Sequence, residues 1–455
     1  MKKTTALILA FLFLFPFVSC TKNKPVTPDE TAAHNETAKS TETAEVTETV
    51  PDNTPEAGIA ATPVPVTADV HFSYTFDPNT DCFTVGSFTL QGLAETEDAY
   101  YWRKPFGGFI FYSDKGSGEF GALCGKPDCL HEMGPNNSEC NALVGYNPLS
   151  SLYVYDGMLY YIGSAKAADG RVLDTVFREE LDGSNRKQLF SIDSFEHAFQ
   201  RFFIHRGKAF FTAETDIVED GLPKKRLEFF CGELNGDGVH SVFEKTIDGE
   251  LGFSFSAGFY GDYAFFFVST YNVSPAMDSN SDTTLYAYDL KNDKVYLIAS
   301  QENCEISIWA VYVDTNGEIY VVPSQMNKFV QAGVYKVVNG EFVKHFEFEG
   351  EEYFGGYSNL GGGFAFSLQA DWDLNGADTI WLKDMDGNTV YNGPLTRHFI
   401  EGRENVKVDV KDMIIHGNSL FIAYTGWIED DPDYSILVRY EITENGLVET
   451  TLAEY

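Results

Sequence analysis

Basic residues are scarce in this sequence. The 455 residues include 32 Lys and Arg against 68 Asp and Glu, which gives a formal net charge of −36 at pH 7. A surface with this excess of negative charge repels phosphate backbones and anionic headgroups, so nucleic acid is not an expected partner. The same charge also serves solubility, and by itself it does not predict a cation-binding role.

The short motifs that mark several enzyme classes are missing as well. The sequence has no Gly-x-Ser-x-Gly elbow, no His-Glu-x-x-His segment and no phosphate-cradling glycine loop. Some enzymes hydrolyse glycans with two carboxylates, but the 68 acidic residues here do not single out a pair. We therefore predict no catalytic residue, and a non-enzymatic role is favoured over an enzymatic one.

The apolar run near the N-terminus is too short to span a bilayer comfortably. It extends from Ala6 to Val18 and follows Lys2 and Lys3, which is the layout of a secretory signal. The segment Phe17-Val18-Ser19-Cys20 resembles the bacterial lipobox, in which a small residue precedes a Cys that is diacylated and becomes the new N-terminus. That family usually has Leu where this chain has Phe17.

This resemblance implies a signal peptide over residues 1–19 and a lipid anchor on Cys20. Two acyl chains suffice for stable attachment, so the expected location is the extracytoplasmic face of the cell membrane. The alternative is a conventional signal cleavage a few residues later.

Aromatic residues are absent from Thr21 to Ala68, where Thr, Glu, Ala and Pro dominate. Such a segment cannot bury enough apolar surface to offset the entropy of ordering the chain. We therefore predict that residues 20–68 form a disordered tether behind the lipidated Cys. An alternating aromatic pattern begins just after Asp69, so the folded domain is predicted to span residues 69–455.

The remaining sequence is rich in aromatic residues and repeats one pattern. No helical periodicity of useful length interrupts it. Aromatic strands followed by Gly or Asp-Gly turns recur about every 50 residues, the spacing of four-stranded propeller blades. The sequence therefore predicts an all-β propeller of seven blades, with six or eight as alternatives. The second strands are expected at Phe109 to Asp114, Leu159 to Ser164, Ala209 to Glu214, Ala264 to Ser269, Ile319 to Ser324, Phe364 to Gln369 and Leu420 to Thr425.

One of these repeats resembles a known family. Leu159-Tyr160-Tyr161 and the later segment Phe177 to Leu189, which contains Leu181-Asp182-Gly183-Ser184, look like the YWTD-type propeller repeat of low-density-lipoprotein-receptor ectodomains and of related bacterial lipoproteins. The match is weaker elsewhere, as in Met385-Asp386-Gly387, and the receptor propellers have six blades. The resemblance implies a binding scaffold, but it does not supply the ligand.

Cys124, Cys129, His131 and Cys140 lie within 17 residues. Similar Cys-x-Lys-Pro-x-Cys-x-His segments occur in the bacterial lipoproteins just mentioned. Three thiolates and an imidazole are a usual ligand set for structural zinc. Secreted cysteines often pair, so a disulfide is an alternative and free thiols are a third. In each case we expect one local unit that closes the first blade in place of a regular fourth strand.

An acidic loop gives a second metal hypothesis. Oxygen-bearing side chains recur around Gly376 in the manner of a calcium loop. The EF-hand pattern fails at Leu382, which stands where Glu would be the last ligand, and Asp and Asn are also ordinary turn residues. A plain hairpin turn is therefore the alternative. The candidate calcium ligands are Asp371, Asp373, Asn375 and Asp378.

Two classes of function remain. The first is a membrane-anchored extracytoplasmic scaffold whose propeller binds a protein, a peptide or a glycan. The alternative is a carbohydrate-active hydrolase or lyase on the same fold. Neither class of function requires a cofactor, and structural zinc and calcium are the two candidates that the sequence offers.

Overall fold

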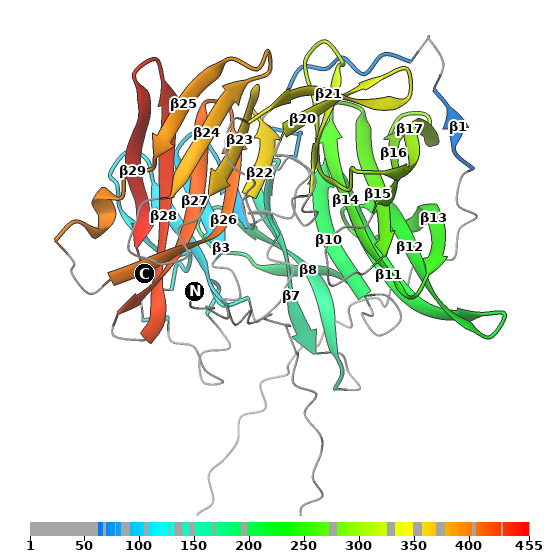
Figure 1. The fold of residues 1–455 in the computed structure, drawn as a ribbon. Coiled ribbons are helices and arrows are strands. Elements are labelled where there is room, and N and C mark those ends of the chain that lie inside the picture. Colours follow the sequence, from blue (N-terminus) through cyan, green and yellow to red (C-terminus); the bar gives the residue numbers. More distant parts are fainter. Residues whose placement is uncertain are drawn as a thin grey trace, which may run out of the picture. The chain divides into compact units, whose positions relative to one another are not determined.

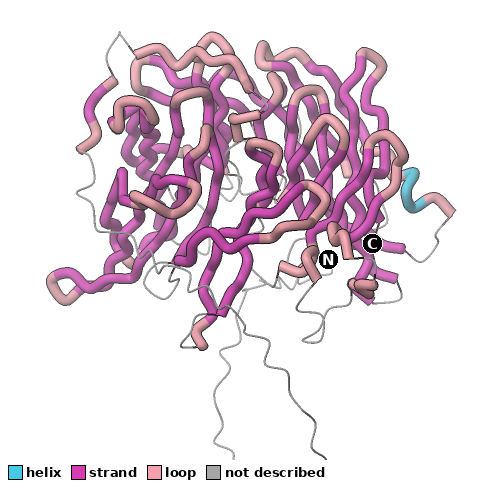
Figure 2. Tube along the Cα trace, turned by 180° about the vertical axis from the view of Figure 1, so that it is seen from behind, coloured by secondary structure: helices cyan, strands magenta, loops and turns pink. Residues whose placement is uncertain are grey.

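The computed structural model describes residues 62–66, 70–77, 79–82, 92–103, 108–126, 128–131, 140–144, 151–166, 170–192, 198–272, 280–324, 333–348, 357–369, 378–402, 406–428 and 431–454. Their strands form seven sheets, each built from four consecutive antiparallel strands and arranged as the blades of a propeller (Figures 1 and 2). The predicted all-β propeller of seven four-stranded blades is therefore confirmed. Within this part of the chain, no helix has the length and apolar character that a membrane span requires.

The first three blades are formed as follows. Blade 1 contains β2 (Leu93–Glu95), β3 (Ala99–Arg103), β4 (Ile110–Asp114) and β5 (Phe120–Ala122). Blade 2 contains β6 (Leu152–Tyr155), β7 (Met158–Lys166), β8 (Val172–Glu180) and β9 (Lys187–Ile192). Blade 3 contains β10 (Ala198–His205), β11 (Lys208–Glu219), β12 (Leu222–Glu233) and β13 (His240–Asp248).

The other four blades repeat the same order. Blade 4 contains β14 (Leu251–Tyr260), β15 (Tyr263–Asn272), β16 (Ser281–Asp289) and β17 (Lys294–Cys304). Blade 5 contains β18 (Ile308–Val313), β19 (Ile319–Pro323), β20 (Gly333–Val338) and β21 (Glu341–Glu347). Blade 6 contains β22 (Tyr357–Gly361), β23 (Phe364–Gln369), β24 (Thr379–Asp384) and β25 (Thr389–Pro394). Blade 7 contains β26 (Val406–His416), β27 (Ser419–Ile428), β28 (Asp431–Thr443) and β29 (Gly446–Glu454).

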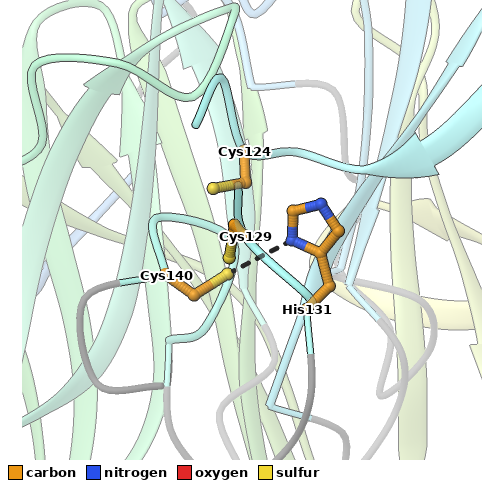
Figure 3. Close-up of side chains that lie close together, drawn as sticks. All are labelled: Cys124, Cys129, His131 and Cys140. Atoms are coloured by element: carbon orange, nitrogen blue, oxygen red, sulfur yellow. Dashed lines mark hydrogen bonds between the residues drawn. The ribbon is translucent and has the colours of Figure 1, made fainter. Parts of the chain in front are cut away.

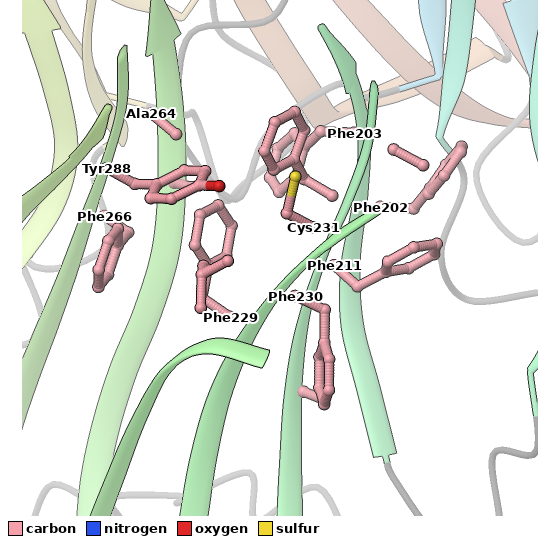
Figure 4. Close-up of a cluster of buried hydrophobic side chains, with 14 of the residues drawn as sticks. Phe202, Phe203, Phe211, Phe229, Phe230, Cys231, Ala264, Phe266 and Tyr288 are labelled. Atoms are coloured by element: carbon pink, nitrogen blue, oxygen red, sulfur yellow. The ribbon is translucent and has the colours of Figure 1, made fainter. Parts of the chain in front are cut away.

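Inner strands of the blades are buried on both faces, because each blade packs between two others. This explains why β15 reads as a nearly continuous apolar run rather than an alternating one. Aromatic rings fill the joint between blades 3 and 4. The ring of Phe266 lies 4.9 Å from that of Phe229 (Figure 4), and it lies 4.8 Å from that of Phe243. The tight turns also follow the sequence, since Arg206 and Gly207 both have the positive φ that a two-residue hairpin turn requires.

The predicted second strand is correct in six blades and wrong in the first. Phe109 to Asp114 corresponds to β4, the third strand of blade 1, and the second strand is β3. The step from Ala99 to Met158 is longer than the later steps because the Cys-containing loop is inserted before blade 2. The expected loss of the fourth strand is also wrong, since the short β5 precedes that loop.

The ring closes between blades 7 and 1 without exchange of strands, because each blade is continuous in sequence. Leu93, Tyr100 and Trp102 of blade 1 pack against Phe421 and Leu437 of blade 7. Arg439 of blade 7 also donates a hydrogen bond to the Tyr100 hydroxyl at 3.0 Å. Among the described residues, side-chain packing and this hydrogen bond therefore close the ring, and the two blades share no strand.

The segment before blade 1 is tied to several blades. Val64–Pro65 forms β1, which pairs in parallel with β17 as a fifth strand of blade 4, at a point before the predicted boundary at Asp69. Residues 70–77 and 79–82, which we call the strap, then pass over the turns that join the first two strands of blades 3, 4 and 5 (Figure 1). The signal peptide, Cys20 and the tether up to residue 61 lie outside the described residues.

Strap side chains contact blades 3 and 4. The Phe72 ring lies 4.9 Å from that of Tyr263, and Tyr74 lies 5.4 Å from Tyr260. At the other end, Arg206 donates a hydrogen bond of 2.6 Å to Asp81. The alternating aromatic pattern of this segment thus serves packing on turns, and the described part of it forms no strand after β1.

Two truncated chains should distinguish the contribution of the tether to stability from that of the strap. Of the described strands, a chain starting at Ala68 loses only the two-residue β1, so we expect a cooperative melt close to that of the full chain. A chain starting after Cys82 also loses Phe72 and the Asp81 ion pair. Burial of one large apolar side chain contributes about 1.5–3 kcal/mol, so this variant should melt at a clearly lower temperature. Equal melting of the two variants would show that the strap contributes nothing.

Candidate metal centre

The four predicted ligands lie together in the structure. The ligand atoms of Cys124, Cys129, His131 and Cys140 are all within 4.8 Å of one another (Figure 3). The Cys140 Sγ and His131 Nδ1 atoms are 3.6 Å apart. Ligands held about 2.0–2.3 Å from a tetrahedral zinc are separated by roughly 3.5–3.8 Å, so a small inward movement would complete the coordination. The donor set and its geometry fit zinc.

Two stretches of backbone carry these ligands. Cys124 follows β5 and buried Leu123, whose N–H donates to the carbonyl of Ile110 at 2.9 Å. Cys140 begins a returning segment, residues 140–144, whose Ala142 carbonyl accepts the N–H of Ile110 at 2.9 Å. Both ends of the loop are therefore fastened to the start of β4. His131 has a φ of 52°, a left-handed conformation that an L-residue adopts at some cost.

The thiols respond differently to this environment. Burial alone would raise the pKa of Cys124, but hydrogen bonds from the backbone N–H groups of Lys126 and Asn141 and from neighbouring thiols lower it on balance. Burial, with the hydrogen bond to Cys129, raises the pKa of Cys140 to about 12. Zinc binds thiolates, so metal binding here would displace protons from these sulfurs.

None of the six described cysteines forms a disulfide. Cys82, Cys231 and Cys304 are buried elsewhere, near His205, Tyr288 and the end of β17 respectively. Three sulfurs in one cluster can form at most one disulfide, and one thiol would then remain. A metal would use all four side chains, whereas a disulfide would use two sulfurs, and the melts described below decide between the two.

Three of the four candidate calcium ligands are not described by the structure, so the calcium hypothesis is untested there. Asp371, Asp373 and Asn375 lie outside the described residues. Asp378 is buried, and its carboxylate Oδ2 lies 2.6 Å from an Nη atom of Arg397. A guanidinium thus already neutralises this carboxylate, and the calcium site stays a prediction.

Sequence reasoning did not find the buried ionisable groups. Glu179 in β8 is fully buried and accepts a hydrogen bond from the Tyr161 hydroxyl at 2.9 Å, and burial raises its pKa to about 7. His205 at the end of β10 is equally buried. Each occupies an ordinary strand position, and only its partner on another strand or segment reveals its role.

Comparison with known proteins finds only a distant likeness to solved structures. No family model matches the sequence, and no curated protein matches it. A puromycin hydrolase structure aligns with 11% identity and a TM-score of 0.44 over 87% of this chain, which spans 57% of the length of that protein. A putative 6-phosphogluconolactonase from Bacteroides uniformis aligns with 11% identity and a TM-score of 0.44, over 82% of this chain and 99% of that one. Likeness at this level carries no information on activity.

Proposed function

We propose that this chain is a lipid-anchored extracytoplasmic scaffold whose propeller binds a protein, peptide or glycan ligand, and whose first blade is held by a structural zinc ion. Cys124, Cys129, His131 and Cys140 would bind the zinc. Four protein ligands leave no open position for a substrate or a reactive water, so the zinc would act in folding.

The use of the buried polar groups carries this proposal. Glu179 is held by Tyr161, and His205 by two backbone groups. Asp378 is held by Arg397. Each of these groups joins strands, blades or segments to one another. All three groups are buried and none of them is open to a substrate, so they support a rigid binding scaffold rather than a hydrolase.

Lipidation at Cys20 is tested by one substitution. Cys20→Ser removes the sulfur that would carry the diacylglyceryl group, so the variant should be released from the membrane or accumulate as uncleaved precursor. The measurement is membrane fractionation with mass determination of the mature chain. The matched control is Cys304→Ser, which leaves Cys20 unchanged and should remain with the membrane. If the Cys20→Ser chain fractionates as the same mature membrane species, the anchor is wrong.

Binding and catalysis are distinguished with one set of glycans. The propeller is applied to a glycan array and is also immobilised as bait for a pull-down from the native cell envelope, and at least one of the two experiments should retain a ligand. The retained glycans are then incubated with the protein and sized by mass spectrometry. Unchanged ligands support the scaffold, whereas shortened products would establish the carbohydrate-active hydrolase or lyase instead.

A further inference from the structure

The loop that carries the four ligands does not belong to blade 1 alone. This metal loop comprises the described residues 123–126, 128–131 and 140–144. Its two ends, Leu123 and Val144, are buried and pack in one cluster with Leu159 and Tyr161 of blade 2. Leu123 precedes the ligand Cys124 directly. The position of this ligand therefore depends on the joint between the two blades.

The turn between β8 and β9 contacts the loop most closely. The side-chain amide of Asn141 donates a hydrogen bond to the carbonyl of Gly183 in that turn. Gly183 has a φ of +76°, and a methyl group added to it would lie 2.5 Å from the carbonyl oxygen of Leu123. Only glycine therefore allows the turn and the loop to approach this closely. Asn141 and Leu123 are each adjacent in sequence to a ligand.

Arg186, just after the same turn, adds a second connection. Its Nη1 donates a hydrogen bond of 2.8 Å to the carbonyl of Leu143 in the returning segment. Its guanidinium lies 4.5 Å from the ring centroid of Phe177, which holds it in place by a cation–π contact. Two hydrogen bonds thus join the turn to the returning segment, and the close approach of Gly183 to Leu123 packs the turn against the other end of the metal loop.

We propose that blade 2 is the dock on which the metal centre is assembled, with Asn141, Gly183 and Arg186 as its positioning residues. The proposal rests on the zinc assignment made above. Groups behind the ligands of a zinc site fix the ligand geometry, and their loss commonly lowers metal affinity 10–100-fold. Zinc binding would in turn fasten blade 1 to blade 2. The close approach of Gly183 to Leu123 also gives a physical reason for the Leu-Asp-Gly-Ser sequence of this turn in blade 2.

Blade 6 provides a matched control. Gly387 occupies the corresponding turn between β24 and β25 with a φ of +86°, so Gly387→Ala introduces a backbone strain similar to that of Gly183→Ala. The nearest atoms to a methyl group there belong to the Phe346 side chain at 3.2 Å, and no metal ligand is involved. Arg439→Ala likewise removes an arginine from a different blade joint.

The test is a chelator competition that gives the apparent zinc affinity of each purified full-length chain, with cobalt absorption as a check on the thiolate ligands. Gly183→Ala and Arg186→Ala should lower zinc affinity tenfold or more, while Gly387→Ala and Arg439→Ala should match the wild type. Wild-type affinity in both blade 2 variants would overturn the dock alone. A wild type that takes up neither zinc nor cobalt would instead overturn the zinc assignment and the dock with it. If Gly183→Ala does not fold, the zinc affinities of Arg186→Ala and Arg186→Lys test the dock by themselves.

Discussion

Chelation is expected to lower the melting temperature of the purified protein, whereas a reductant should leave it unchanged. Zinc bound by Cys124, Cys129, His131 and Cys140 contributes its binding free energy to the folded state, because unfolded chain does not hold these ligands together. Removal of a tightly bound ligand costs several kcal/mol, which corresponds to a shift on the order of 5 °C for a domain of this size. Differential scanning calorimetry with parallel metal analysis measures both quantities.

His131→Asn is the sharpest variant for this experiment. Asn tolerates the left-handed backbone found at His131, so the substitution removes the imidazole ligand with little backbone strain. The variant should lose zinc, and its melt should no longer respond to chelator. His240→Asn removes a histidine outside the cluster and should behave as the wild type. If reductant rather than chelator lowers the melting temperature, the cluster contains a disulfide. If neither lowers it, the four residues do not form a structural unit.

The blade architecture could be predicted because its signals are local. Turn residues such as Arg206 and Gly207 specify hairpins from within a few positions, and aromatic strands mark what lies between them. The first blade was misassigned because the metal loop interrupts the spacing on which the prediction depended. The four ligands were also found locally, since they lie close together in the chain.

The partners of these elements could not be predicted, because they come from distant parts of the sequence. Gly183 is 42 positions from Asn141, and the arginine that holds Asp81 is 125 positions away. Nothing in a strand pattern shows that Glu179 will be buried beside Tyr161. Sequence periodicity thus predicts the strands, whereas the contacts between strands and between blades depend on packing in three dimensions.

The buried histidine that holds the strap should make stability depend on acidity. The Nδ1 atom of His205 accepts a hydrogen bond of 2.9 Å from the N–H of Cys82, and its Nε2–H donates to the carbonyl of Gly261 at 2.6 Å. Both bonds need the neutral ring, since a proton on Nδ1 would face the N–H of Cys82. Burial lowers the pKa of His205 to about 4.

The sign of the effect follows from this shift. Between pH 6.5 and 4 the unfolded chain binds a proton that the folded chain does not bind, so folding loses free energy as the pH falls through this window. The full contribution is present above pH 6.5, and the difference between the ordinary pKa of histidine and that of His205 corresponds to about 3 kcal/mol. Asp81, Arg206 and Asp262 lie around the ring and influence its charge.

His205→Gln isolates this contribution. The Gln amide can accept from Cys82 and donate to Gly261 but does not titrate, so the variant should lose less stability than the wild type between pH 6.5 and 4. Denaturant unfolding across that range gives the two slopes, and His240→Gln serves as control because that side chain lies outside the strap contacts. If the His205→Gln and wild-type curves run parallel, protonation of this ring does not govern the hold on the strap. If they diverge as expected, opening of the His205 contact should expose the N–H of Cys82 in the wild type. Hydrogen exchange at that amide, corrected for the intrinsic exchange rate, should then accelerate over the same pH window.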